Sequence, residues 1–566
     1  MNISTNVITY PDLFNDSNQD VNHLLKNIDS DILIQVMCYI NSYLFPYNDD
    51  DVTVKQKEIF QKFFRRLPNG TRYKLEVLIE NKKILFLRSS ILEFVQYVFM
   101  NYHIIHEFED TTPEHELNLL KAYLLISDKK QDKSFNLKKN DKKQELFYTF
   151  FWPFLAQQFD LNKIEHPIFP LLKGAIYLSY FKNNEKYNSY YNEFLDKSGC
   201  KTGWEYIHKL ILLSKNGYEN EPVAQVGTDY TNPFFKNSIF NHDEFLKAEH
   251  LRKNFNGFKA RPIYKANNNQ LYIIDWDFLN RKFFDGLIRD FYEVTSIHQI
   301  IKKFPDFLAT FSKDISEDIL FRKTIEACFK NRFNEILFNR FPEKCPADCY
   351  LRYNQYIFLF EFKNNSFSSK SLDAGSFDSI KEEIDRKMNF TYNWEDNTKN
   401  KGVAQIINQI KQLHESFESQ NKLSRDKIKF RNMVIIPIVV YSDKVFGMPG
   451  INDYLNSEFL KYQSTLGDLN FKKIEDLTLI NINFFIQNLD AFRSGNIRLF
   501  MDLITDYRSK IKKRKQNHKS NPDIKKYDQL FDSFEDIEFY SNPDFFRNNS
   551  GGFAKRAIEI FAIDIF

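Results

Sequence analysis

Apolar residues recur three and four positions apart through most of the first 220 residues. This spacing gathers them on one face of an α-helix, because a helix completes a turn in about 3.6 residues. Helices are therefore predicted over the ranges 32–44, 54–67, 75–105, 117–126, 146–159, 171–195 and 204–213. We expect an all-helical region that ends near residue 220, with a lysine-rich solvated loop at 128–143.

Beyond residue 220, proline, asparagine and glycine interrupt shorter apolar runs, which predicts hairpins and short helices. The runs 356–360, 433–441 and 477–480 are short and dense enough to be buried strands. Pro437 lies within the second run, and a proline favours an edge or a bulge because it has no N–H to donate. The order helix, hairpin, strand, helix, strand predicts an α/β core in which helices flank a mixed sheet.

A chain of 566 residues favours several domains, and its 59 Phe and 30 Tyr residues are ample for sizeable cores. We divide it into four parts. These are an all-helical region (1–220), a lead-in segment of hairpin and helix (221–310), the α/β core (311–500), and a C-terminal extension that is first basic, then acidic and aromatic (501–566).

The first predicted strand ends with a carboxylate and a lysine. Side chains alternate along a strand, so Glu361 and Lys363 project to one side, whereas Phe360 and Phe362 enter the core on the other. If the segments on either side of 353–355 form a hairpin, Asp348 returns to the same edge. Two carboxylates and a lysine then face one point.

Such a set suits a hard divalent cation. Mg²⁺, for which Mn²⁺ can substitute, is held by one or two carboxylates together with water and substrate phosphate, and Asp348 and Glu361 supply that pair. Lys363 beside the ion would orient a water molecule or neutralise developing charge. The alternative is an exposed salt bridge at a strand end. Other acid-x-lysine triplets lie in helical or polar sequence, at 80–82, 141–143, 385–387 and 523–525.

With Asp348 as first acid and Glu361-Phe362-Lys363 as second half-motif, the chain resembles the PD-(D/E)xK nuclease superfamily over roughly residues 258–485. The segments 261–265, 271–275 and 278–287 are similar to a hairpin and helix that precede the core in some larger members. The resemblance makes the α/β core a nuclease core. The first acid follows Ala347, with Pro346 one position earlier, and a polar insertion (364–400) comes after the lysine.

Two further residues gain a role from the resemblance. Glu326, on the helical stretch 321–329, corresponds to a glutamate that supports the metal or a second ion. Gln405, on the helix after the insertion, corresponds to a glutamine that helps the site. From the residues alone, Glu326 is also compatible with a helix-surface ion pair to Lys323 or Lys330, and Gln405 with an ordinary polar position on an amphipathic helix.

The resemblance implies a Mg²⁺-dependent nuclease that hydrolyses phosphodiester bonds, with DNA favoured over RNA by family analogy, and restriction or antiviral defence as its setting. The helical region would then recognise a trigger protein or form oligomers. The competing hypothesis is a non-catalytic nucleic-acid-binding or scaffold protein on a lapsed nuclease fold. The complete set of two acids and a lysine argues against lapse.

A dense cationic run occupies residues 508–515. Its candidate phosphate-binding residues are Lys510, Lys512, Lys513, Arg514 and Lys515. Such a run contacts phosphates without reading sequence. A solvated helix end or linker explains the same composition.

Charge and cysteine content add limits. The net charge of +3 is too small to indicate a partner. Five scattered cysteines do not suit a disulfide framework, so we expect a cytoplasmic protein. Cys345 and Cys349 have no second Cys or His pair at zinc-binding spacing. We find no leader, and no run approaches the eighteen apolar residues that a membrane span needs.

Overall fold

The computed structural model forms two compact units. Unit 1 comprises Met1–Leu146, Asp160–Lys302 and Ile565–Phe566, and unit 2 comprises Phe147–Phe159 and Lys303–Asp564. The residues that the structure describes are 7–16, 19–45, 52–105, 111–132, 148, 152–153, 156, 161, 165–218, 224–227, 232–331, 334–338, 348–391, 399–420, 430–467, 469–520, 528–536 and 553–565. Within these ranges, no helix has both the length and the apolar character to cross a membrane.

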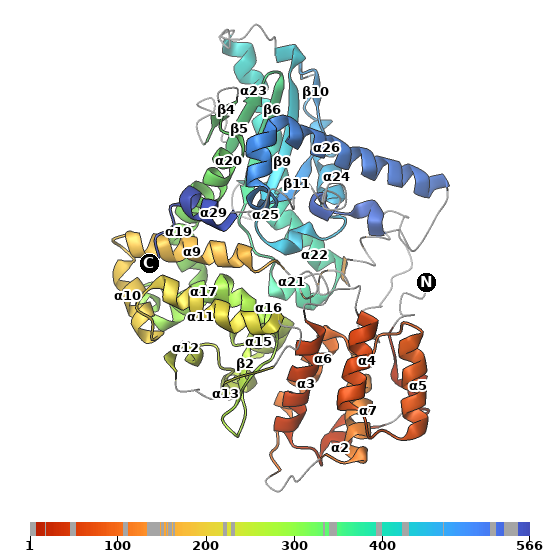
Figure 1. Ribbon diagram of the computed structural model, residues 1–566. Coiled ribbons are helices and arrows are strands. Elements are labelled where there is room, and N and C mark those ends of the chain that lie inside the picture. Colours follow the sequence, from red (N-terminus) through yellow and green to blue (C-terminus); the bar gives the residue numbers. More distant parts are fainter. Residues whose placement is uncertain are drawn as a thin grey trace. The chain divides into compact units, whose positions relative to one another are not determined.

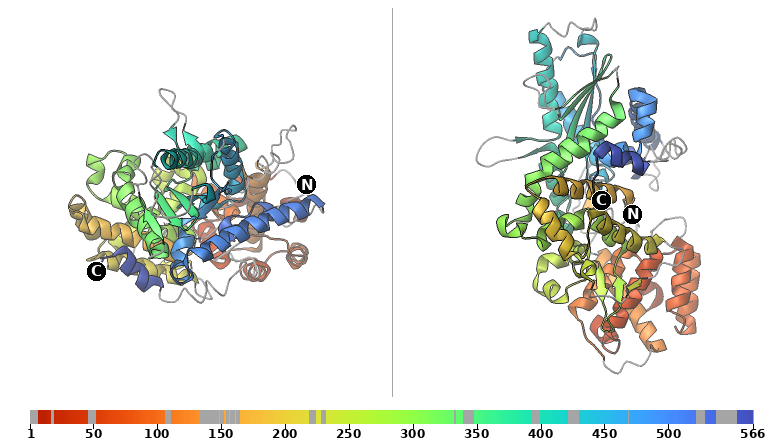
Figure 2. Two further views of the ribbon diagram at one scale, coloured as in Figure 1. Left: turned by 90° about the horizontal axis from the view of Figure 1, so that it is seen from above. Right: turned by 60° about the vertical axis from the view of Figure 1, so that its left-hand side comes forward.

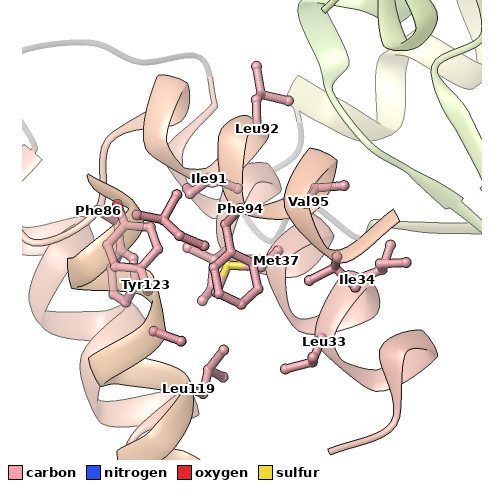
Figure 3. Packing of buried hydrophobic residues seen from close by; sticks show 14 of the residues in the cluster. Leu33, Ile34, Met37, Phe86, Ile91, Leu92, Phe94, Val95, Leu119 and Tyr123 are labelled. Carbon is pink, nitrogen blue, oxygen red and sulfur yellow. The ribbon is translucent and has the colours of Figure 1, made fainter. Parts of the chain in front are cut away.

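The described part of unit 1 before residue 220 is helical (Figure 1). Its longer helices are α3 (Ser30–Leu44), α4 (Val52–Phe63), α5 (Asn69–Glu80), α6 (Arg88–Met100), α7 (Pro113–Asp132), α9 (Ile168–Asn183), α10 (Asn188–Lys197) and α11 (Gly203–Lys215). Shorter helices are α1 (Tyr10–Leu13) and α2 (Val21–Leu25). Figure 3 shows part of the core formed by helices up to α7, in which Met37 and Phe94 pack among aliphatic and aromatic side chains.

Two predicted long helices are each a pair of helices. The range 75–105 breaks between α5 and α6, where Lys82 adopts a left-handed backbone with φ of 62° and ends the first helix. The range 171–195 breaks between α9 and α10, where Asn184 is extended. Apolar periodicity continues through both breaks, so the pattern alone did not reveal them. The predicted helix at 146–159 falls mostly outside the described residues.

After residue 220, unit 1 contains a small sheet in the order β1 (Gln225–Gly227), β3 (Leu271–Ile273), β2 (Ile263–Lys265). The hairpin β2–β3 turns through Asn269, whose positive φ of 63° suits asparagine. Between β1 and β2 lie α12 (Pro233–Lys236), α13 (His242–Lys247), α14 (Glu249–Arg252) and α15 (Asn256–Ala260), and after β3 come α16 (Trp276–Asn280), α17 (Asp285–Val294) and α18 (Ile297–Ile300).

Unit 2 is built on a mixed six-stranded sheet (Figure 1). Its strands are β4 (Glu335–Leu337), β5 (Cys349–Tyr353), β6 (Tyr356–Lys363), β9 (Val434–Tyr441), β10 (Lys473–Ile474) and β11 (Thr478–Asn481). The order is β10-β9-β6-β5-β4, and β11 also pairs with β9. Strands β4, β5 and β6 pair antiparallel, whereas β6, β10 and β11 run parallel to β9.

Helices cover both faces of this sheet. On one face, β6 residues Ile357 and Leu359 join a core with α22 (Phe377–Ile384), α23 (Val403–Gln420) and α24 (Ile451–Gln463). On the other face, Phe358 and Phe360 pack against Phe500 of α26 (Leu489–Ser520), near α20 (Arg322–Phe329) and α25 (Ile482–Gln487). Figure 2 shows α23 and α26 on opposite sides of the sheet. The structure therefore has helices on both faces of a mixed sheet, as expected for an α/β core.

Pro437 lies within β9, which has partners on both sides. Val434 donates its N–H toward β6, at Gln355, and Ile435 accepts on the opposite side, from Glu475. Backbone groups alternate in direction, so the N–H that proline lacks would point away from β6. There β10 pairs with residues 434–435 and β11 with residues 438–441. The proline thus occupies the break between two short neighbouring strands.

The insertion at 364–400 contains ordered helical structure. It includes α21 (Ser369–Ala374), α22, the π-helix η6 (Asp385–Asn389), and the short strands β7 (Phe390–Thr391) and β8 (Lys399–Asn400). Ile380, Ile384 and Met388 are fully buried in the unit 2 core. The same core contains Tyr148 and Trp152, which come from the N-terminal half of the sequence.

Candidate active site

The candidate site begins with the hairpin β5–β6. Asn354 has a positive φ of 53° at its turn, and Tyr353 faces Tyr356 across it. The register places Cys349 opposite Phe360, so Asp348, one residue earlier, stands opposite Glu361. Directly opposite residues on one face of a sheet have their side chains close together. The hairpin expected from sequence therefore brings the two acids side by side. Pro346 and Cys345 lie outside the described residues.

Asp348 and Glu361 interact across the hairpin. The backbone N–H of Phe362 donates to Oδ2 of Asp348 at 2.7 Å. Burial and the negative charge of Glu361 raise the pKa of Asp348 to about 7. Burial also raises the pKa of Glu361, and this residue is only 1 % exposed. Without a cation, the negative charges of the two acids therefore disfavour each other.

Lys363 links the acid pair to helix α23. Its Nζ donates to Oε1 of Glu361 at 2.7 Å and to Oε1 of Gln405 at 2.6 Å. The same oxygen of Gln405 accepts from the backbone N–H of Gly402 at 2.9 Å. Gln405 is the third residue of α23, and its side chain accepts from the residue just before the helix, as in a capping box. The structure brings Gln405 to the lysine despite the intervening insertion.

Gln409 is a second glutamine at the site, and sequence reasoning missed it. It lies one turn after Gln405 on α23, so both face the same strand. Its Nε2 donates to Oε2 of Glu361 at 2.8 Å, and the residue is 1 % exposed. Each oxygen of Glu361 therefore has a donor, Lys363 on one and Gln409 on the other. The four-residue spacing of the two glutamines was the available signal.

Glu317 is the third carboxylate near the pair, and it was also missed. It lies on the π-helix η5 (Lys313–Phe321), which continues α19 (Phe304–Ser312) and runs into α20. Burial and the charge of Asp348 raise the pKa of Glu317, and Lys363 acts in the opposite direction. Glu317 is therefore near enough to interact electrostatically with the acid pair. π-Helical turns are uncommon and concentrate at functional sites.

A short polar network fixes η5 against the strand ends. Asn364 donates from Nδ2 to Oγ of Ser316 at 2.6 Å and accepts from Oγ of Ser442 at 2.7 Å. Ser442 in turn donates its N–H to the carbonyl oxygen of Lys363 at 3.2 Å. Because Ser316 precedes Glu317, this network holds the glutamate beside the ends of β6 and β9.

The structure does not bring Glu326 to the acid pair. Glu326 lies on α20, accepts from Nε of Arg322 at 3.3 Å, and acts electrostatically on Cys349. Cys349 points to the opposite face of β5 from Asp348, because side chains alternate along a strand. The surface ion pair considered for Glu326 is present, with Arg322 in place of the lysines.

The cationic run lies on the last turns of α26, and intramolecular ion pairs involve much of it. Lys510 pairs with Asp506 and Arg514 with Asp532, both at 2.7 Å. Lys515 pairs with Asp453. Lys512 and Lys513 are exposed, and neither has an ion pair within the described part of the chain. These two lysines are the members of the run with charge available for a partner.

The oxygen donors at the site suit a hard cation, although they do not form a complete set of metal ligands. The described residues contain no group of three or more His, Cys, Asp or Glu side chains arranged to hold a metal ion. Mg²⁺ requires fewer protein ligands, since it retains waters and binds through one or two carboxylates plus phosphate. Two adjacent carboxyl groups with raised pKa values, Asp348 and Glu361, match this need.

Comparison of the chain with protein-family models, with curated proteins and with solved structures gives no match. Any assignment of function to the site therefore depends on its own residues and geometry.

Proposed function

We propose that unit 2 is a metal-dependent nuclease of the PD-(D/E)xK type that hydrolyses phosphodiester bonds in nucleic acid, with DNA favoured over RNA. The observation that supports this most is that Asp348 and Glu361 lie opposite each other on the hairpin, with Lys363 hydrogen-bonded to the second acid. Two adjacent acids with raised pKa values destabilise the metal-free protein, and a purely structural site would not need this arrangement.

In this proposal Asp348 and Glu361 hold Mg²⁺ or Mn²⁺. When bound, the ion polarises a phosphoryl oxygen and lowers the pKa of its water. Lys363 orients the attacking water and balances negative charge as it develops. Gln405 and Gln409 fix the positions of Lys363 and Glu361, respectively. Glu317 adds negative charge near Asp348.

The experiment is a cleavage assay on linear duplex, circular and single-stranded DNA and on RNA, with and without Mg²⁺ or Mn²⁺. We expect cleavage only with the cation, and its loss in each of Asp348→Ala, Glu361→Ala and Lys363→Ala, with the fold retained. If all substrates stay intact although the protein binds nucleic acid, the competing hypothesis of a scaffold on a lapsed nuclease fold holds instead.

The setting is a further part of the proposal. Unit 1 would recognise a trigger protein or form oligomers, and cleavage would serve restriction or antiviral defence by analogy with such fusions. Size-exclusion chromatography of the full chain tests the oligomeric part. A monomer at all concentrations would leave recognition of another protein as the role of unit 1.

A further inference from the structure

The π-helix η6 (Asp385–Asn389) lies beside the candidate active site. Asn365, two residues after Lys363, donates from Nδ2 to the carbonyl oxygen of Lys387 at 3.3 Å. The next residue, Met388, places its carbonyl oxygen against Gly402, at the start of the helix that carries Gln405. The segment η6 is therefore adjacent both to the end of β6 and to the first turn of α23.

Its position is fixed by contacts at its other residues. Asp385 accepts from the hydroxyl of Tyr454 at 2.7 Å and from Asn389 at 3.2 Å, and it pairs with Lys381 at 2.7 Å. Met388 is fully buried. The backbone that carries Lys387 is thus held from both sides, so its side chain starts from a defined position.

Lys387 carries a positive charge near two acids, Glu383 and Asp443. It is half-buried, and burial lowers its pKa. Within the described residues its ammonium group makes no ion pair, whereas the two nearby acids have other donors. Glu383 accepts from the N–H of Ser368 at 3.1 Å and pairs with Arg386, and Asp443 accepts from the N–H groups of Phe367 and Val445.

The backbone of Lys387 lies beside the ends of the central strands. Its carbonyl oxygen accepts from Asn365, two residues after β6 ends at Lys363. Asp443, two positions after the end of β9, interacts electrostatically with Lys387, and the residue before Asp443 donates its N–H to the carbonyl oxygen of Lys363. Lys387 therefore lies near the carboxyl ends of the parallel strands β6 and β9. Ligands of α/β sheets bind at these ends.

We propose that Lys387 is a positioning residue that binds a backbone phosphate of nucleic acid next to the phosphate undergoing cleavage. The inference rests on the proposed function. Three acids, one lysine and a bound Mg²⁺ carry no net charge together, so the site itself attracts a polyanion weakly and a further cation nearby strengthens its binding. Lys387 supplies this charge with a small loss of hydration and of conformational entropy on binding, because it is already partly desolvated and its backbone is already fixed.

The test compares three variants in the full chain: Lys387→Gln, Lys387→Arg and Lys370→Gln. Lys370 is the matched control, since it is an exposed lysine on α21 of the same insertion and makes none of the contacts that fix η6. Binding to a short labelled DNA duplex is titrated at several salt concentrations, each variant being made also with Lys363→Ala so that the duplex stays intact. Steady-state cleavage is measured with Lys363 present, and melting temperatures report on folding.

We expect Lys387→Gln to raise KM several-fold with kcat nearly unchanged, and to reduce the slope of log affinity against log salt by about 1. Lys387→Arg should restore both values, and Lys370→Gln should match the wild type. An unchanged slope and KM in Lys387→Gln, or the same changes in Lys370→Gln, overturns the inference. A wild-type protein that cleaves no nucleic acid refutes the proposed nuclease instead, and the salt slope still reports on Lys387.

Discussion

Gln409 donates a 2.8 Å hydrogen bond to Oε2 of Glu361 from a fully enclosed position on α23. The bond stabilises the ionised form of the carboxylate, since a hydrogen bond from an amide favours the charged acceptor. It also fixes the rotation of the carboxyl group, because Lys363 holds the other oxygen. Gln409 thus orients a proposed metal ligand without approaching the substrate.

Replacing Gln409 by methionine should therefore reduce cleavage while the metal ligands stay in place. Partners of metal ligands typically contribute 10- to 100-fold to affinity or activity, and we expect a loss of about that size in kcat for Gln409→Met. Gln412→Met, on the same helix, is the control and should cleave normally. Equal activity of both variants with that of the wild type would mean that Glu361 needs no second donor.

The site hairpin could be predicted from local sequence. A dense apolar strand, a turn and alternation of side chains were enough to place Asp348 beside Glu361 and to project Lys363 to the same face. The register follows from the turn at Asn354, which local sequence also indicates. The mixed sheet flanked by helices was predictable because β6, β9 and β11 are short apolar runs, whereas the short strands β4 and β10 were not predicted.

The rest depends on tertiary contacts that one sequence does not specify. Glu317 and Glu326 are nine residues apart, roughly 13 Å along a helix, so only one of the two carboxylates can lie beside the pair Asp348 and Glu361. Which one does so is set by the π-helical turns of η5 and their attachment through Ser316. Likewise, the burial of Gln409 depends on how α23 packs on the sheet.

These positions predict different effects for the two glutamates. Glu317→Gln should lower cleavage at least tenfold, because it removes a carboxylate that interacts with Asp348. Glu326→Gln should retain nearly full activity, since that carboxylate pairs with Arg322 at the opposite face. Rates at saturating Mg²⁺ decide the matter. Greater damage from Glu326→Gln would restore the role that the resemblance implied for it.

Stability without metal should fall as pH rises. The folded pKa of Asp348 is about 7, above its ordinary value of 3.8, so the folded state binds more protons than the unfolded state between these values. The unfolding free energy then decreases from about pH 4 to about pH 7 and levels off above that. Asp348→Asn removes the buried charge, and we expect it to be about 1–3 kcal/mol more stable than the wild type above pH 7.

Urea denaturation at several pH values measures this difference, and Mg²⁺ supplies its control. The cation should stabilise the wild type at pH values above 7 by binding the two carboxylates, and should have little effect on Asp348→Asn. Wild-type stability that rises with pH over this range, or an equal response of both proteins to Mg²⁺, would contradict the proposed site.

Gly402 allows a matched test of how α23 is anchored. Its φ is +47°, and a Cβ there would overlap the carbonyl oxygen of Met388, whereas Gly467, with φ of +70°, has open space around it. Gly467→Ala should cost about 1 kcal/mol of stability from backbone strain alone. Gly402→Ala should cost about 2 kcal/mol more and reduce cleavage, because Gln405 moves with the helix start.

Chemical denaturation of the two alanine variants gives the comparison directly. The difference between them isolates the clash, since both pay the penalty for a positive φ. Equal stabilities would show that the backbone of η6 at Met388 moves away from the added Cβ at little energetic cost. The contact with α23 would then not constrain Gln405.

The cationic run on α26 divides into paired and unpaired members, and this division predicts two outcomes. Lys512→Gln with Lys513→Gln should flatten the salt dependence of DNA binding by about 2 in slope if both contact phosphates, with the melting temperature unchanged.

Arg514→Gln with Lys515→Gln breaks the ion pairs to Asp532 and Asp453 and should lower the melting temperature with little change in slope. Metal-dependent stabilisation should survive in both, because phosphate contacts position the substrate and leave the acid pair untouched. Affinity measured across a salt series distinguishes the cases. An unchanged slope in the first variant identifies this end of α26 as a solvated helix end and directs the search for phosphate contacts to Lys387 and the strand ends beside it.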